Sequence, residues 1–135
     1  MFQLISLHGS YYRLDLAINK LKELKDNNIK IALDDFGCGY SSLTYLKLLP
    51  INIVKIDRSF IADIQSEYDT KNMTNIIILM ARQLGLNVIA EGVEFKYQLD
   101  YLKKHGCDMF QGYLISKPVP AEEIINLIKL QETII

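Results

Sequence analysis

Four apolar stretches of this sequence each end in a carboxylate, a lysine or an amide. The residues in question are Asp34 with Asp35, Lys55, Glu91 and Gln111. Carboxylates suit divalent metal ions, and a lysine ammonium can hold a phosphate oxygen or orient a water molecule. A partly buried carboxylate is also a candidate general base. If the fold brings these residues together, they would suit metal-assisted chemistry on a phosphate ester.

The alternation of apolar and amphipathic segments indicates which elements must position these side chains. Helical spacing predicts helices over residues 14–25, 41–48, 73–84, 97–105 and 121–130. Nearly continuous apolar runs predict strands over 29–33, 51–56, 87–90 and 107–110, and residues 1–7 could form a further strand. Strands that alternate with helices favour a parallel sheet with helical crossovers. The carboxyl ends of such strands lie at one edge, where polar groups far apart in sequence converge.

Composition and charge narrow the class of protein. With 50% hydrophobic and 23% charged residues, the chain has the balance of a folded domain with a core. Its 15 basic and 16 acidic residues are spread along the chain, which disfavours DNA as a partner but leaves a nucleotide ligand open. Cys38 and Cys107 are expected to be reduced thiols in the cytoplasm. We expect neither a signal peptide nor a membrane segment within this chain.

Several of these residues also have plain structural interpretations. Asp35 could simply begin a turn, although both aspartates can face one cavity where the strand breaks into a loop. Asp57 could pair with the arginine that follows it or cap the next segment. Glu94 could support its loop or cap a helix, and Gln111 could close a turn. Chance placement at four consecutive strand ends is improbable, so we interpret the set as one site.

Four motifs carry a resemblance to a known family. They are residues 31–43 (IALDDFGCGYSSL), 54–60 (VKIDRSF), 89–94 (IAEGVE) and 111–113 (QGY). In order, spacing and context they closely resemble EAL domains over about residues 14–128. EAL domains are bacterial signal-transduction phosphodiesterases that linearise cyclic di-GMP to 5′-pGpG with two Mg²⁺ or Mn²⁺ ions. The resemblance implies the same substrate, cofactor and hydrolase activity here.

The resemblance also implies a role for each site residue. Asp34 and Asp35 would be metal ligands, with Asp35 tied to the second ion. Lys55 would hold the hydrolytic water or the phosphate. Glu91 would act as general base or orient the water, and Gln111 would help to place it.

A further group of residues would support the site. The loop over residues 36–42 resembles the one that couples metal binding to dimerisation in the family. The supporting residues implied are Gly37, Gly39, Ser41, Asp57 and Glu94.

The chain departs from the family pattern in its first half. The Glu-Ala-Leu motif, a metal-binding Asn and a second metal-binding Glu belong to the preceding half-barrel or its edge; residues 4–6 read Leu-Ile-Ser instead, and Cys38 stands where Thr is usual. A complete TIM-like barrel needs roughly 250 residues, whereas this chain has 135. We therefore expect residues 1–135 to be a truncated EAL domain, the C-terminal half of a (β/α) barrel with four to five parallel strands.

Three functions follow from these observations. The first is half of a cyclic di-GMP phosphodiesterase, inactive alone, and the second is a non-catalytic EAL-like module that binds nucleotide or protein. A doubly wound α/β domain for another phosphate is disfavoured, because the chain has no Gly-x-Gly-x-x-Gly or Walker loop. A half-barrel exposes two sheet edges, so we expect a homodimer or docking to a complementary half-barrel or another signalling domain.

Overall fold

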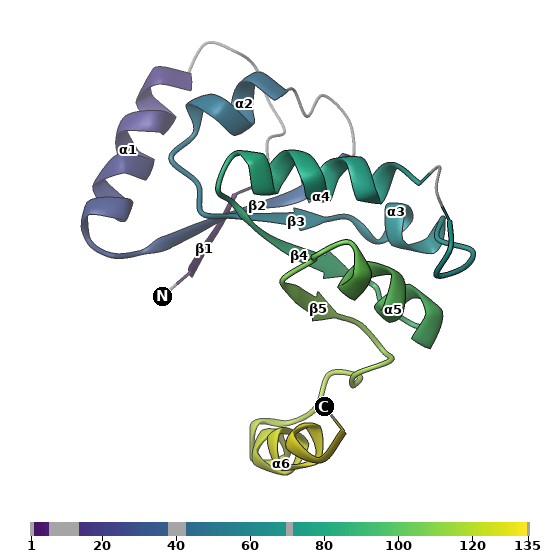
Figure 1. Cartoon of the computed structure of the whole chain (residues 1–135). Coiled ribbons are helices and arrows are strands. Elements are labelled where there is room, and N and C mark those ends of the chain that lie inside the picture. The colour runs from purple at the N-terminus through teal and green to yellow at the C-terminus, as the bar shows by residue number, and fades with distance from the viewer. Residues whose placement is uncertain (1, 6–13, 38–42, 70–71, 135) are drawn as a thin grey trace.

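The computed structural model describes residues 2–5, 14–37, 43–69 and 72–134 (Figure 1). Its strands are β1 (Phe2–Ile5), β2 (Lys30–Phe36), β3 (Ile53–Ile56), β4 (Asn87–Glu91) and β5 (Met109–Gln111). Its helices are α1 (Leu14–Asp26), α2 (Leu43–Leu48), α3 (Arg58–Ala62), α4 (Met73–Gln83), α5 (Lys96–Lys104), the 3₁₀ helix η2 (Ala121–Glu123) and α6 (Ile124–Ile134). Within these ranges, no helix is long and apolar enough to cross a membrane.

The five strands form one parallel sheet in the order β1-β2-β3-β4-β5. Spatial order follows chain order without the reversal of a doubly wound sheet, as in a (β/α) barrel. β1 and β5 are the edges of the sheet in the described part of the chain. This arrangement confirms the predicted α/β half-barrel, including a first strand within residues 1–7.

Each central strand presents alternate residues to the helices. Ile31 and Leu33 of β2 and Val54 and Ile56 of β3 belong to the buried core cluster, as do Val88 and Ala90 of β4. Because side chains alternate along a strand, the residues between them, including Lys55, face the other side of the sheet. Figure 1 shows α1, α2 and α4 along the helical side. The core therefore lies between sheet and helices, and the opposite face is left for the site.

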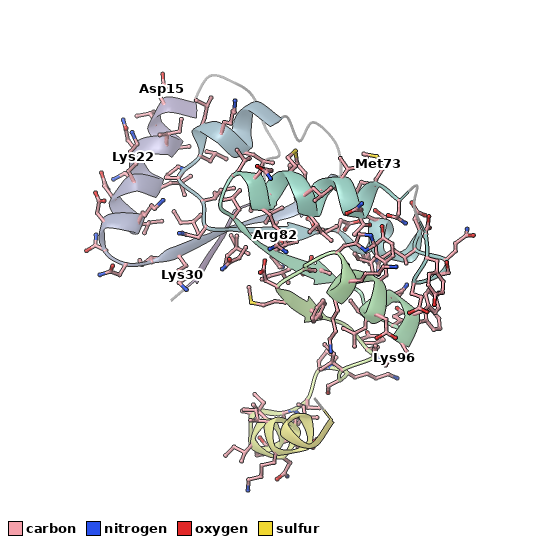
Figure 2. All side chains as sticks on the ribbon, viewed as in Figure 1. Asp15, Lys22, Lys30, Met73, Arg82 and Lys96 are labelled. Atoms are coloured by element: carbon pink, nitrogen blue, oxygen red, sulfur yellow. The ribbon has the colours of Figure 1, made fainter. Side chains whose placement is uncertain are left out.

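The outer surface of this helical layer is charged on α1 and apolar on part of α4. Asp15 and Lys22 point away from α1, as the stick view shows (Figure 2). On α4, Met73, Ile76 and Leu79 are each more than half exposed. The predicted amphipathic character of residues 14–25 is thus confirmed, and residues 73–84 are apolar on an exposed face as well.

The helix α3 was not predicted from the sequence. It is short and follows Asp57, whose side-chain Oδ1 accepts hydrogen bonds from the backbone N–H (2.9 Å) and hydroxyl (2.5 Å) of Ser59. An aspartate at this position satisfies an N–H that the helix itself leaves unpaired. Of the interpretations offered for Asp57, helix capping is therefore the one that the structure bears out.

Candidate functional site

The two adjacent aspartates lie in a β-bulge at the end of β2. Leu33 pairs with Val54 and Phe36 with Ile56, so β2 places two residues opposite one residue of β3. The two residues are Asp34 and Asp35, and Asp35 has a φ of 50°, in the left-handed region. A regular strand would send adjacent side chains to opposite faces, whereas a bulge removes this alternation. Both carboxylates can therefore serve the same site.

Lys55 of β3 lies between the carboxylates of its two neighbouring strands. Its Nζ is 2.8 Å from Asp34 Oδ1 and 2.6 Å from Glu91 Oε1, and its side chain is only 13% exposed. Burial lowers the pKa of Lys55, but the hydrogen bonds and charges of Asp34 and Glu91 outweigh burial and leave it raised. Lys55 is therefore a charged ammonium that joins β2, β3 and β4 across the site.

Three carboxylates converge around this lysine. Asp34, Asp35 and Glu91 each offer an oxygen atom, and these atoms lie within 4.8 Å of one another. All three side chains are partly buried. Carboxylate oxygens are the ligands that Mg²⁺, Mn²⁺ and Ca²⁺ prefer. Asp34 and Glu91 each keep one oxygen for an ion while the other accepts from Lys55. The donor set therefore fits a hard divalent cation.

The helix α3 fixes two of the loops that carry these ligands. Gly37, directly after β2, has a φ of 104°, and a Cβ there would lie 2.2 Å from the Phe60 ring. Gly92, directly after β4, has a φ of 73°, and its Cβ would lie 2.6 Å from Arg58 Cβ. Both positions need glycine for backbone conformation and for close packing. The contacts tie the residues beside Asp35 and Glu91 to one short helix.

The buried amide of Gln98 fixes the loop after β4. Its Oε1 accepts from the backbone N–H groups of Glu94 (2.9 Å) and Phe95 (3.0 Å), and its Nε2 donates to the Ile61 carbonyl (3.0 Å). Phe95 is the N-cap of α5 and has no side-chain acceptor, so Gln98 satisfies the helix start in its place. The loop is thereby joined to the end of α3.

A cavity of about 390 Å³ opens at this edge of the sheet. Its lining residues are Asp35, Asp57, Arg58, Glu91, Gly92, Glu94, Gln111, Gly112 and Tyr113. The lining holds four carboxylates and one arginine. Such a cavity repels an anionic ligand unless cations offset its charge.

The structure brings most of the predicted site residues together. Asp34, Asp35, Lys55 and Glu91 form the cluster described above. Gln111, which pairs with Glu91 in the sheet, is exposed at the cavity wall.

The predicted supporting residues divide into two groups. Glu94 and Asp57 line the cavity, and Gly37 lies beside the bulge against Phe60. Gly39 and Ser41, like Cys38, lie outside the described residues.

Sequence reasoning missed Gln98 and the lining residue Arg58. Gln98 lies three residues after Phe95, and a glutamine at the third position of a helix is a known capping signal. Arg58 had no comparable signal, because it acts here through the position of α3 against Gly92.

Comparison with known proteins assigns the family. The EAL domain family matches residues 6–118. The cyclic di-GMP phosphodiesterase NbdA of Pseudomonas aeruginosa is 45% identical over 109 residues, which cover 81% of this chain and 14% of that protein. The chain therefore belongs to the EAL domain family.

Solved structures agree with this assignment. The EAL domain of Mycobacterium smegmatis DcpA matches with a TM-score of 0.85 and 34% identity over 96% of this chain and 58% of that one. Klebsiella pneumoniae BlrP1, in a manganese and cyclic di-GMP complex, matches with a TM-score of 0.74 and 29% identity over 87% of this chain and 30% of that one. The chain thus spans a little over half of the DcpA chain and a much smaller part of NbdA.

Proposed function

We propose that this chain forms the C-terminal half of a metal-dependent cyclic di-GMP phosphodiesterase site. The observation that carries the proposal is the cluster of Asp34, Asp35 and Glu91 around Lys55 at the strand ends of an EAL domain. The manganese and cyclic di-GMP complex of BlrP1 supports the choice of ion and ligand.

In this proposal the chain's own residues hold the ion and place the attacking water. Asp34, Asp35 and Glu91 would bind a divalent ion such as Mg²⁺ or Mn²⁺. When bound, the ion supplies Lewis-acid polarisation of the phosphodiester and a lowered pKa for water. An ammonium has three N–H donors, so Lys55 can hold both carboxylates and still donate to a water or phosphate oxygen.

The remaining roles fall to Glu91 and Gln111. Glu91 contacts Lys55 through Oε1, and its second oxygen has two lone pairs, so Glu91 could bind the ion and also act as general base for the attacking water or orient it. The exposed amide of Gln111, next to Glu91 across β4 and β5, would help to place that water. Water attack on phosphorus with loss of one ester bond would give the linear dinucleotide 5′-pGpG.

The charge of the cavity explains why this function would need the metal. Cyclic di-GMP carries two phosphate charges, and the cavity lining adds four carboxylates against one arginine. Divalent ions would be needed to offset this repulsion. Substrate binding and metal binding should therefore be strongly coupled.

We further propose that catalysis needs ligands from the first half of the barrel. The chain covers 58% of the DcpA chain, and the Glu-Ala-Leu motif is absent from its sequence. The three carboxylates would then be part of a larger ligand set. The chain alone should be inactive, whether the other half comes from the same polypeptide, a partner or a second copy.

The test combines the chain with an N-terminal half-barrel. The purified chain is incubated with cyclic di-GMP and Mn²⁺ or Mg²⁺, alone and with the N-terminal half of the DcpA EAL domain, and 5′-pGpG is followed by chromatography. We expect product only in the mixture, and none when the chain carries Asp34→Asn. Lys20→Met on the exposed face of α1 is the matched control and should leave turnover unchanged.

Other results would change the proposal in defined ways. Product from the chain alone, lost on Asp34→Asn, would mean that the chain completes the site by itself, for example as a dimer. Metal-dependent binding of cyclic di-GMP without turnover in the mixture would favour a non-catalytic binding module. If the mixture shows no binding of cyclic di-GMP and no turnover, the phosphodiesterase proposal is refuted.

A further inference from the structure

Lys55 stands where a bound ion would compete for ligands. Both Asp34 Oδ1 and Glu91 Oε1 contact its Nζ, at 2.8 Å and 2.6 Å. These two carboxylates are also members of the three-carboxylate cluster. The same groups therefore serve the protein's internal cation and any divalent ion.

The charge of the cluster limits how many ions it can hold. Three carboxylates and one ammonium leave two negative charges, which a single divalent cation neutralises. A second divalent ion would give the cluster a net positive charge in a partly buried position, where charge imbalance is costly. Asp57 and Glu94 line the nearby cavity but lie outside the three-carboxylate cluster, so a second ion would need ligands from beyond that cluster.

The ammonium also opposes the first ion. A lysine and a divalent cation that share carboxylates lie within a few ångströms of each other, and like charges at such distances repel strongly away from bulk water. Lys55 joins Asp34 and Glu91 before an ion arrives, and by this repulsion it would lower their affinity for that ion. Only 13% of the Lys55 side chain is exposed, so the ammonium would have to leave a largely buried position to reach solvent.

We propose that Lys55 is an internal counter-cation that restricts this chain to one divalent ion and weakens the binding of that ion. The inference rests on the proposed function in that Asp34, Asp35 and Glu91 are taken as the metal ligands. It makes Lys55 a residue that sets metal affinity and stoichiometry, in addition to its contact with water or phosphate.

The test measures Mn²⁺ alone, without substrate. Isothermal titration and the electron paramagnetic resonance of free Mn²⁺ give affinity and stoichiometry for the full chain and four variants. Lys55→Met and Lys55→Gln remove the charge, and Gln retains donors for the carboxylates. Lys55→Arg keeps the charge, and Lys20→Met removes an exposed lysine from α1 as a matched control. Circular dichroism confirms the fold of each variant.

We expect one Mn²⁺ per chain in the wild type. Lys55→Met and Lys55→Gln should bind Mn²⁺ at least about tenfold more tightly, whereas Lys55→Arg and Lys20→Met should stay within about threefold of the wild type. Because the two neutral variants carry the same expectation, either one tests the inference if the other does not fold.

Results that contradict the role of Lys55 can be distinguished from results that contradict the proposed metal site. The counter-cation role alone would be overturned if the neutral variants bound Mn²⁺ no more tightly than the wild type. It would also be overturned if the wild type bound two ions per chain. Absence of Mn²⁺ binding in the wild type and in every variant would remove the metal site itself. Binding seen only in the neutral variants would support the inference.

Discussion

The helices α5 and α6 are both amphipathic but have very different surroundings. In α5, Gln98, Tyr101 and Leu102 are almost completely buried, and Gln98 is bonded to α3. In α6, Ile124, Ile125 and Ile128 are between 46% and 63% exposed. Figure 1 shows α5 against the sheet and α6 apart from it, after an extended segment. The apolar face of α5 is buried in the core, whereas the apolar residues of α6 named above are exposed.

The difference shows what an amphipathic pattern does and does not specify. Periodic apolar residues predict that a helix has one face to bury, but they do not identify the surface that buries it. For α5 that surface is the core beside β4. Among the described residues, α6 packs chiefly against η2, the short turn before it.

Truncation of one buried leucine in α5 should show most clearly how the two helices differ in their contribution to stability. Leu102→Ala removes a fully buried side chain from the core and should lower the free energy of unfolding by about 3 kcal/mol. Ile128→Ala, at a site 53% exposed, should change it by less than about 0.5 kcal/mol. Urea denaturation followed by circular dichroism measures both. Equal losses would mean that α6 is packed in solution.

Thiol reactivity gives a second contrast. Burial is the main cause that raises the pKa of Cys107, three residues beyond the end of α5, to about 11. In a Cys38→Ser background, its native thiol should react with a disulfide reagent at pH 8 at least about a hundredfold more slowly than a cysteine introduced by Ile128→Cys. Similar rates would contradict the buried position of Cys107.

The same pKa predicts a pH dependence of stability. The unfolded thiol ionises near its ordinary value of 9.0, whereas the folded thiol keeps its proton up to about 11. The contribution of Cys107 is therefore fully present below pH 9 and declines as the pH rises toward 11. Comparison of the Cys38→Ser chain with and without Cys107→Ala across this range isolates the effect. A slope that persists without Cys107 would assign it to other groups.

The next smaller effect concerns the amide that anchors the start of α5. Gln98→Met would leave the N–H groups of Glu94 and Phe95 and the Ile61 carbonyl without the partner they have here. We expect a loss of about 2 kcal/mol and faster hydrogen exchange at the Glu94 and Phe95 amides. Gln83→Met, at an exposed position of α4, is the matched control and should do neither.

The smallest effect is a gain in stability. The Tyr101 hydroxyl is buried and has no hydrogen-bond partner among the described residues. Tyr101→Phe removes this unsatisfied group and keeps the ring that stacks on His105. Unfolding should then require up to about 1 kcal/mol more. A loss of similar size would show that the hydroxyl is bonded in solution.

The sequence was sufficient to predict the alternating elements other than α3, and the gathering of polar residues at the strand ends. Apolar runs at residues 31–33, 53–54 and 88–90 lie in buried strands, and the polar residue after each, Asp34, Lys55 or Glu91, lies at the shared edge. These features are local in sequence, so local patterns reveal them. The same holds for Gly85, which has positive φ at the end of α4.

The interactions that join separate segments could not be predicted in this way. The contact between Gly37 and Phe60, and the bond from Gln98 to Ile61, depend on where α3 lies in space. Nor does sequence alone say that Lys55 pairs with both carboxylates at once. Such features follow from sheet register, which sets the neighbours of each side chain.

The left-handed backbone of Asp35 decides which substitutions can probe its carboxylate cleanly. Aspartate, asparagine and glycine adopt this conformation with little penalty, whereas other residues pay roughly 1 kcal/mol or more. Alanine scanning at residue 35, whose φ is 50°, would therefore report backbone strain together with loss of the ligand. Asparagine keeps the bulge and removes only the charge. The geometry that lets two neighbouring aspartates share a site thus also limits which substitutions can test that site without straining the backbone.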